Sequence, residues 1–248
     1  PESGYVIINF LSYIFYLINQ TAVYKTLFYE PLLCDNIVRM KKLMTVVYPV
    51  GSGLYINLTN KCPCNCTFCI RQSAKNEFDH IETLWLEHEP SFEEVVQALE
   101  NAGVPSYKEV VFCGYGEPTE ALDVLLRTAD FIKSNYDVPV RINTNGLGNL
   151  INGRDITPLL KGRIDVVSIS LNSSRPEIYE KTVRPVFREK AFPALLDFAK
   201  KAAAVVPSVI LTTVSTTITP EDEDECRRLC RSLGVTYRIR EYEPLTTS

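Results

Sequence analysis

The chain has 248 residues, and its 46% hydrophobic content is enough to build one large domain with a sizeable core. Its 26 basic and 30 acidic residues give a net charge of -4, which argues against bulk, nonspecific binding of nucleic acids. It contains only two histidines, which argues against a histidine-rich zinc or dimetal hydrolase site.

The first 43 residues differ in composition from the rest. Residues 3–24 carry no charge and are rich in Ile, Leu, Phe and Tyr, over a length that would suffice to span a membrane. Polar residues such as Asn9 and Asn19 interrupt this stretch, and no Lys or Arg precedes it as in a signal peptide. We therefore interpret residues 1–43 as a hydrophobic N-terminal extension or translated upstream sequence rather than a membrane anchor, and residues 44–248 as the core domain.

From Gly53 onward, predicted strands alternate with predicted helices. A capping box at Ser91 and Glu94 begins the first helix, and Gly103 ends it. Further helices are predicted over 122–132, around 191–204 and over 219–234. Alternating or continuous apolar residues predict six strands, over 54–58, 109–113, 138–143, 164–171, 208–214 and 235–240.

This alternation predicts an α/β fold with a parallel sheet and helices outside it. Right-handed crossovers curl such a sheet into a barrel-like arc. Six strands rather than eight predict a partial (β/α)6 TIM-like barrel. In that architecture the functional loops gather at the C-terminal ends of the strands.

Four of the eight cysteines lie in one loop directly after the first predicted strand. Cys62, Cys66 and Cys69 have the spacing C-x3-C-x2-C, so their sulfurs can converge on one inorganic centre. Three thiolates on a cuboidal iron–sulfur cluster leave one iron open to bind a substrate. Because this dense spacing suits a metal better than disulfides, we expect a reducing, cytoplasmic location.

A glycine-rich segment follows the second predicted strand. Gly114 and Gly116 let the backbone approach a ligand closely, and the carboxylate of Glu117 suits an ammonium group. The alternative is a simple glycine turn into a helix whose first turn favours an acid.

Polar side chains also end the third and fourth predicted strands. Period-two alternation places Asn143 on one face of its strand, and Ser170 and Asn172 on one face of theirs. Polar residues facing into a barrel at its C-terminal rim indicate a ligand. The alternative is that they only cap the turns that follow.

The cysteine spacing, with Phe68 directly before the last cysteine, resembles the radical S-adenosylmethionine (SAM) superfamily. The resemblance implies a [4Fe-4S] cluster on Cys62, Cys66 and Cys69, whose open iron chelates the amino and carboxylate groups of SAM. Five motifs together resemble the TatD-family-associated radical SAM proteins, with coverage from Met44 to Tyr242. The motifs are 57–71, 84–90, 112–120, 141–147 and 153–158.

The resemblance also implies SAM contacts. Gly114, Gly116 and Glu117 correspond to a Gly-Gly-Glu segment that holds the SAM amino group, although Tyr115 separates the two glycines here. The ribose and carboxylate would be reached by Ser170 and Asn172, and Asn143 would face SAM or the substrate. The superfamily's glycine-rich adenine segment after the fifth strand is absent, so the backbone near Phe68 is the candidate for adenine.

These features predict an enzyme that cleaves SAM reductively to a 5'-deoxyadenosyl radical. The radical would abstract hydrogen from a small molecule, a nucleoside or a partner protein. The reaction would be of an oxidoreductase-like or activase-like kind. The electrons would come from a donor such as flavodoxin or ferredoxin. The alternative is a non-catalytic zinc or iron–sulfur module with Cys64 as fourth ligand. We favour the enzyme because the cysteine motif is a specific match to the superfamily. Since a thiolate on the fourth iron would exclude SAM, we expect Pro63 to turn the Cys64 side chain away.

Overall fold

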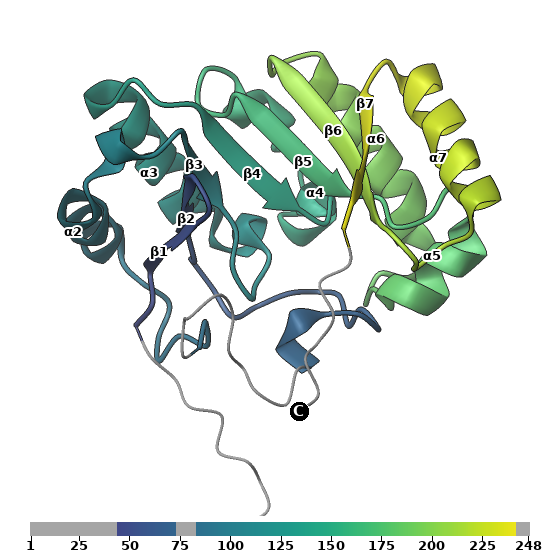
Figure 1. The fold of residues 1–248 in the computed structure, drawn as a ribbon, viewed down its shortest axis with the longest axis horizontal. Coiled ribbons are helices and arrows are strands. Elements are labelled where there is room, and N and C mark those ends of the chain that lie inside the picture. Colours follow the sequence, from purple (N-terminus) through teal and green to yellow (C-terminus); the bar gives the residue numbers. More distant parts are fainter. Residues whose placement is uncertain (1–43, 73–82, 242–248) are drawn as a thin grey trace, which may run out of the picture. The chain divides into compact units, whose positions relative to one another are not determined.

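The computed structural model describes residues 44–72 and 83–241 (Figure 1). All of these belong to one structural unit. The expected N-terminal extension, residues 1–43, lies outside the described residues. Within the two described stretches, no helix has the length and apolar character that crossing a membrane requires.

A seven-stranded sheet forms the centre of this unit. β1 pairs antiparallel with β2, and each following pair of neighbours is parallel. The six parallel strands confirm the predicted α/β fold with a partial barrel, whose edges are β1 and β7. The strands are β1 (Val47–Val50), β2 (Gly53–Ile56), β3 (Glu109–Phe112), β4 (Val140–Thr144), β5 (Val166–Ser170), β6 (Ser208–Val214) and β7 (Thr236–Arg240).

β1 is an addition to the six predicted strands. It forms a hairpin with β2, in which Val50 pairs with Gly53 and Gly51 adopts a φ of 55°. Pro49 lies within β1 and lacks the N–H that a central strand would need. An edge strand tolerates this proline, whereas the sequence pattern alone argues against a strand there.

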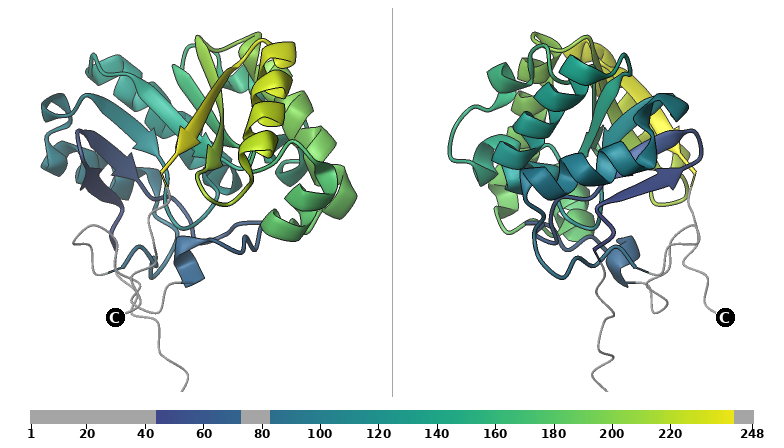
Figure 2. Two further views of the ribbon diagram at one scale, coloured as in Figure 1. Left: turned by 45° about the vertical axis from the view of Figure 1, so that its right-hand side comes forward. Right: turned by 90° about the vertical axis from the view of Figure 1, so that its left-hand side faces the viewer.

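The helices lie along one face of the sheet (Figures 1 and 2). The α-helices are α2 (Phe92–Ala102), α3 (Leu122–Asn135), α4 (Gly148–Ile151), α5 (Pro176–Val183), α6 (Ala191–Ala203) and α7 (Pro220–Leu233). Short 3-10 turns connect them: η1 (Ile70–Gln72), η2 (Val104–Ser106), η3 (Pro118–Ala121), η4 (Thr157–Leu160) and η5 (Arg188–Lys190).

The predicted helix ends of α2 are confirmed. The Ser91 hydroxyl accepts from the Glu94 N–H at 3.2 Å, and the Glu94 carboxylate accepts from the Ser91 N–H at 2.8 Å. Gly103 ends the helix with a φ of 70°, a conformation that glycine adopts without a Cβ clash.

The last helix also begins and ends as predicted. The Thr219 side chain caps the first turn of α7, and Gly234 ends the helix in the left-handed conformation. Cys226 and Cys230 are buried on this helix within the hydrophobic core, where they pack as small apolar side chains.

The two faces of the sheet differ in character. Phe112 and Ile142 are fully buried in the core that the sheet shares with the helices. Because side chains alternate along a strand, Asn143, Ser168 and Ser170 belong to the opposite face. The register pairs Asn143 with Ser168 across β4 and β5, so these polar groups form a row. The polar row lies toward the C-terminal ends of the parallel strands, where the cysteine loop also begins.

Candidate functional site

The cysteine loop leaves the end of β2 and is fixed on one side by the segment 84–86. The Asn57 side chain donates to the Leu84 carbonyl at 2.7 Å, and the Asn60 side chain donates to the Leu86 carbonyl at 2.8 Å. The Asn60 side-chain oxygen accepts from the Leu86 N–H at 3.0 Å. These two asparagine side chains therefore hold the loop to the segment 84–86 beyond the end of β2, where the chain no longer pairs as a strand.

The end of α5 fixes the loop on its other side. The N–H of Asn65 donates to the Val183 carbonyl at 3.1 Å, and the N–H of Thr67 donates to the Thr182 carbonyl at 2.9 Å. The carbonyls at the end of a helix lack partners within the helix, so the loop satisfies them. The contact continues beyond the helix, because the Val186 N–H donates to the Pro63 carbonyl at 2.9 Å.

The four thiols of the loop face a shared space. Cys62, Cys66 and Cys69 are partly buried and Cys64 is buried. The Cys64 thiol hydrogen bonds with the sulfurs of Cys62 and Cys66, and it accepts from the Asn145 side chain at 3.7 Å. The expectation that Pro63 turns Cys64 away from the other thiols is therefore wrong.

The backbone fixes the position of Cys64. The chain bends at Pro63, and Cys64 itself forms an isolated antiparallel bridge with Pro185.

The bonds from Cys64 lower the pKa of the Cys62 and Cys66 thiols, and the charge of Arg71 lowers these pKa values further. Burial raises the pKa of Cys69, and Arg71 opposes that rise. The loop thus favours thiolates at Cys62 and Cys66, the form in which cysteine binds metal.

Arg71 is a site residue that the sequence did not single out. Its guanidinium donates to the carbonyls of Asn60 and Tyr115, at 3.4 Å each, and it stacks 5.5 Å from the Trp85 ring centroid. These contacts hold the positive charge beside the thiols. A cation two residues after the last cysteine was the sequence signal that could have indicated this role.

No three His, Cys, Asp or Glu side chains in the described parts of the chain are gathered so as to hold one metal ion. A [4Fe-4S] cluster differs from a single ion because each thiolate binds a different iron. The donor chemistry of three ionisable thiols beside one arginine fits such a cluster, and Cys62, Cys66 and Cys69 as its ligands remain a prediction.

The two predicted glycines bring the loop after β3 against the cysteine loop. A Cβ on Gly116 would lie 2.2 Å from the Thr59 carbonyl oxygen, and one on Gly114 would lie 2.1 Å from the Asn57 side-chain oxygen. The Glu117 N–H donates to the Lys61 carbonyl at 2.8 Å. The glycines are therefore required for close packing of two loops, whatever they contact in a ligand.

Glu117 is buried and bonded on both carboxylate oxygens. Oε1 accepts from the hydroxyls of Thr119 at 2.8 Å and Thr144 at 2.7 Å, and from the Thr119 N–H at 3.2 Å. Oε2 accepts from the Asn145 N–H at 2.7 Å. Burial raises the pKa of Glu117, and these bonds oppose the rise. Since Oε2 accepts this one protein bond, it keeps capacity for a further donor.

The side-chain oxygens of Asn143 and Asn172 are buried and have no hydrogen-bond partner among the described residues. The Asn143 side chain hydrogen bonds with the Cys113 thiol. The Asn172 amide donates to the Ser170 carbonyl at 3.2 Å, and Asn172 has a φ of 62°. Buried acceptors without a donor are costly, by about 1–3 kcal/mol each, so these two oxygens fit contacts with a polar ligand.

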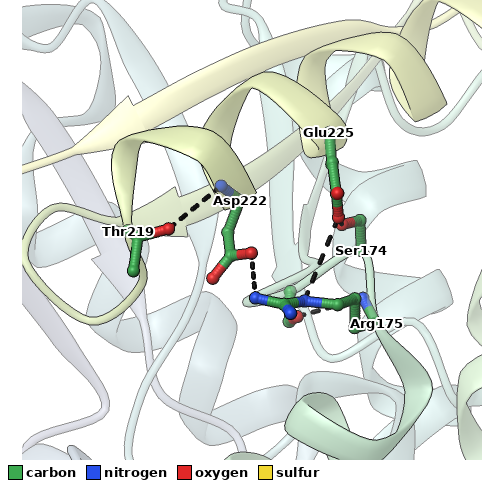
Figure 3. Close-up of polar contacts among 6 residues, drawn as sticks. Ser174, Arg175, Thr219, Asp222 and Glu225 are labelled. Carbon is green, nitrogen blue, oxygen red and sulfur yellow. Dashed lines mark hydrogen bonds and ion pairs between the residues drawn. The ribbon is translucent and has the colours of Figure 1, made fainter.

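The loop that carries Asn172 is fixed to α7 by a polar network (Figure 3). Arg175 forms an ion pair with the buried Asp222, and the Ser174 hydroxyl donates to Glu225 at 3.2 Å. Thr219 accepts from the Asp222 N–H at 3.3 Å, so the cap of α7 also orients this carboxylate. The partners lie about fifty residues apart in the chain, which is why the sequence pattern did not indicate them.

A cleft of about 510 Å³ opens beside the cysteine loop. Cys62, Arg71 and Trp85 line it, together with Glu120 and Phe187. Asn143, Ser170 and Asn172 are not among its lining residues. Of the predicted ligands Cys62 lines this cleft, whereas the polar strand-end residues belong to the open face of the sheet. Phe68 is partly buried in the loop next to Cys69.

The model of the family described as "Radical SAM superfamily" matches residues 56–233. The chain belongs to the radical SAM superfamily. A relative described as a probable GTP 3',8-cyclase, from Thermococcus kodakarensis, is 31% identical over 138 residues, which cover 52% of this chain and 38% of the relative.

Two solved radical SAM structures share the fold. A radical SAM methyltransferase from Sphaerobacter thermophilus matches with a TM-score of 0.54 at 13% identity, over 80% of this chain and 69% of that one. A second structure, native anSMEcpe with bound AdoMet, matches with a TM-score of 0.54 at 16% identity, over 76% of this chain and 50% of that one.

As a radical SAM protein, the chain uses a [4Fe-4S] cluster and SAM, which confirms the cofactors that the resemblance implied. Its membership supports an enzyme with SAM-dependent radical chemistry. The chain spans less than half the length of the Thermococcus relative.

Proposed function

We propose that Cys62, Cys66 and Cys69 hold the [4Fe-4S] cluster and that the chain is an enzyme that abstracts hydrogen from its substrate. The bound cofactors supply the chemistry, which is reductive cleavage of SAM to a 5'-deoxyadenosyl radical. One observation carries the proposal. The C-x3-C-x2-C loop begins at the end of the sheet where Asn143 and Asn172 present buried oxygens without partners.

The chain's own residues bind and orient. Arg71 favours the thiolate form of the cluster ligands. In SAM binding, Oε2 of Glu117 and the loop of Gly114 and Gly116 would accept the amino group. Asn143 and Asn172 present acceptors to SAM or substrate.

Further contacts with SAM remain predictions. Ser170 lies on the same face as Asn143 and is assigned to the ribose or carboxylate of SAM. The backbone beside Phe68 is assigned to adenine.

The substrate class that we favour is a nucleotide or another anionic small molecule. Arg238 on β7 pairs in register with Thr212, which pairs with Ser170, so a cation extends the polar row of the open face. The charge of Arg240 also reaches the Cys113 thiol, whose pKa it lowers against the effect of burial. GTP is the first compound to test because a relative is described as a GTP 3',8-cyclase. A nucleoside or a partner protein, as in an activase-like role, is the next class.

The resemblance to TatD-family-associated radical SAM proteins stays a prediction, as do the cytoplasmic location and a flavodoxin or ferredoxin as electron donor.

Anaerobic reconstitution tests the proposal. The chain with a full cluster, given dithionite and SAM, should form 5'-deoxyadenosine and methionine. Addition of the correct substrate should raise the yield of 5'-deoxyadenosine, so GTP is compared with a nucleoside lacking phosphates. A full cluster that cleaves no SAM would contradict the proposal. A variant with Ala at Cys62, Cys66 and Cys69 is the control.

The alternative ligand set includes Cys64, whose thiol hydrogen bonds with those of Cys62 and Cys66. A fourth thiolate would leave the cluster no open iron for SAM. The electron paramagnetic resonance spectrum of the reduced protein, recorded with and without SAM, separates a closed cluster from an open one.

A further inference from the structure

Tyr179 is a buried tyrosine on α5 whose hydroxyl has no hydrogen-bond partner in the described part of the chain. The side chain is only 1% exposed, and its ring packs against Phe192 with centroids 5.4 Å apart. Buried hydroxyls normally find an acceptor, because an unpaired donor loses its bonds to water without replacement. The position of this hydroxyl therefore calls for an acceptor that is absent from the protein alone.

Tyr179 lies on the helix that holds the cysteine loop. α5 bonds that loop through the carbonyls of Thr182 and Val183, which lie three and four residues after Tyr179 and so on the same face of the helix. Tyr179 and Cys64 are both buried in the hydrophobic core. Burial raises the pKa of Tyr179, and the charges of Cys64, Cys66 and Cys62 follow as the next causes of that rise.

Two kinds of acceptor could fill this space once the cofactor is bound. Thiolate and inorganic sulfide are both hydrogen-bond acceptors, and a cluster bound by this loop would supply both kinds of sulfur. Phe at this position would fill the same apolar volume, so packing alone gives no reason for the hydroxyl.

We propose that the Tyr179 hydroxyl donates a hydrogen bond to a sulfur of the [4Fe-4S] cluster and thereby raises the reduction potential of the cluster. The inference rests on the proposed cluster ligands Cys62, Cys66 and Cys69. A donor to sulfur stabilises the reduced cluster more than the oxidised one, because reduction adds negative charge to the sulfurs, and such bonds are among the factors that set cluster potentials. Tyr179 would thus make the cluster easier to reduce while touching neither SAM nor substrate.

The test compares Tyr179→Phe with the wild-type chain, both reconstituted to full iron and sulfide content. Redox titration followed by electron paramagnetic resonance should show a lower midpoint potential in the variant. We expect the ratio of reduced to oxidised cluster at a fixed potential to fall about tenfold, which is 59 mV for a one-electron couple. Tyr237→Phe is the matched control, because its hydroxyl bonds Thr213 at 2.6 Å on β6, and it should leave the potential unchanged.

A second measurement uses the wild-type chain directly. Electron–nuclear double resonance of the reduced cluster, in H2O and in D2O, should detect an exchangeable proton that the Tyr179→Phe variant lacks and the Tyr237→Phe variant keeps. An unchanged or raised potential at full iron content would overturn the inference, as would identical proton signals in wild type and Tyr179→Phe. If the wild-type chain assembled no cluster, the proposed function itself would fail, and iron analysis would show this first.

Discussion

The side-chain amide of Asn145 lies 3.7 Å from the sulfur of Cys64. This contact joins the residue after β4 to the cysteine loop after β2, which are separated by eighty-one positions in the chain. The backbone N–H of Asn145 also bonds the buried carboxylate of Glu117 at 2.7 Å. Cys64 is therefore held by a side-chain donor just after β4 as well as by its backbone bridge to Pro185.

We expect Cys64→Ala and Cys64→Ser to keep cluster content and SAM cleavage near wild type, whereas Ala at Cys62, Cys66 or Cys69 should abolish both. A thiolate on the fourth iron would exclude SAM, so an active cluster requires Cys64 to stay off the metal. Iron and sulfide analysis and the yield of 5'-deoxyadenosine measure the two effects. Cluster loss in the Cys64 variants with retention in the Cys62 variant would move the ligand set to Cys64, Cys66 and Cys69.

Gly116→Ala should destabilise the fold strongly because the new Cβ would lie 2.2 Å from a backbone oxygen of Thr59, which cannot rotate away. Forced overpacking of this kind costs about 3 kcal/mol or more of unfolding free energy. Gly162→Ala is the control, since it adds a Cβ with no atom within 4 Å at a φ of 75°. The control should lose only about 1–2 kcal/mol from the left-handed backbone. Equal losses in urea unfolding would contradict the close approach of the two loops.

The sheet could be predicted because each parallel strand is a short apolar or alternating run followed by glycine or polar residues. The run over 164–171 contains β5, and the run over 208–214 coincides with β6. α5 was missed, because its eight residues include β-branched Ile, Thr and Val, and it carries no capping side chain. Its bonds to the cysteine loop depend on tertiary packing, which no local pattern expresses.

The candidate site was predictable only in part, for the same physical reason. Cysteine spacing is local, so Cys62, Cys66 and Cys69 stand out in the sequence. Tyr179, by contrast, becomes notable only when its hydroxyl is seen to lie buried without a partner. The surroundings of Glu117 likewise come from residues up to twenty-eight positions away, which provide four donors to this carboxylate.

Glu117 also gives the fold a pH dependence with a definite sign. Burial raises the pKa of this carboxyl above its ordinary value of 4.5 in the folded chain. The folded state then holds the proton more tightly than the unfolded state, so the contribution of Glu117 to stability is greatest below pH 4.5 and falls as the pH rises through the raised pKa.

The comparison with Glu117→Gln isolates this effect because glutamine does not titrate. We expect the unfolding free energy of wild type to decrease relative to the variant as the pH increases from 4 toward 7. Urea unfolding at several pH values provides the measurement. A difference that moves the other way would mean that the four hydrogen bonds outweigh burial and depress the pKa.

Asp222→Asn should loosen the loop that carries Asn172. The buried carboxylate of Asp222 pairs with Arg175, and the loss of a hydrogen bond to a charged group costs roughly 1.5–3 kcal/mol of unfolding free energy. Asp224→Asn is the control on the same helix, because its partner Arg227 and the carboxylate are both exposed, and it should change stability by no more than about 0.5 kcal/mol. If Asn172 contacts SAM, Asp222→Asn should also weaken SAM binding several-fold, measured by calorimetry on the reconstituted chain. If Asp222→Asn were less stable than wild type but bound SAM with unchanged affinity, the polar network would stabilise the fold without positioning a SAM contact.

Arg71 should control the pH at which the cluster assembles. Its charge lowers the pKa of the Cys62 and Cys66 thiols and opposes the rise at Cys69, so Arg71→Gln should raise the pKa of all three. Fewer thiolates are then available at a given pH, and only thiolates bind iron. Iron content after reconstitution, measured as a function of pH, should therefore rise at a higher pH in Arg71→Gln than in wild type.

The Arg71→Lys variant keeps the positive charge but loses the bonds to two carbonyls and the stacking on Trp85. Its iron content should therefore rise at a pH between those of wild type and Arg71→Gln. Identical profiles in wild type and Arg71→Gln would show that the arginine fixes the loop through its contacts with Asn60 and Tyr115 without setting the ionisation of the thiols.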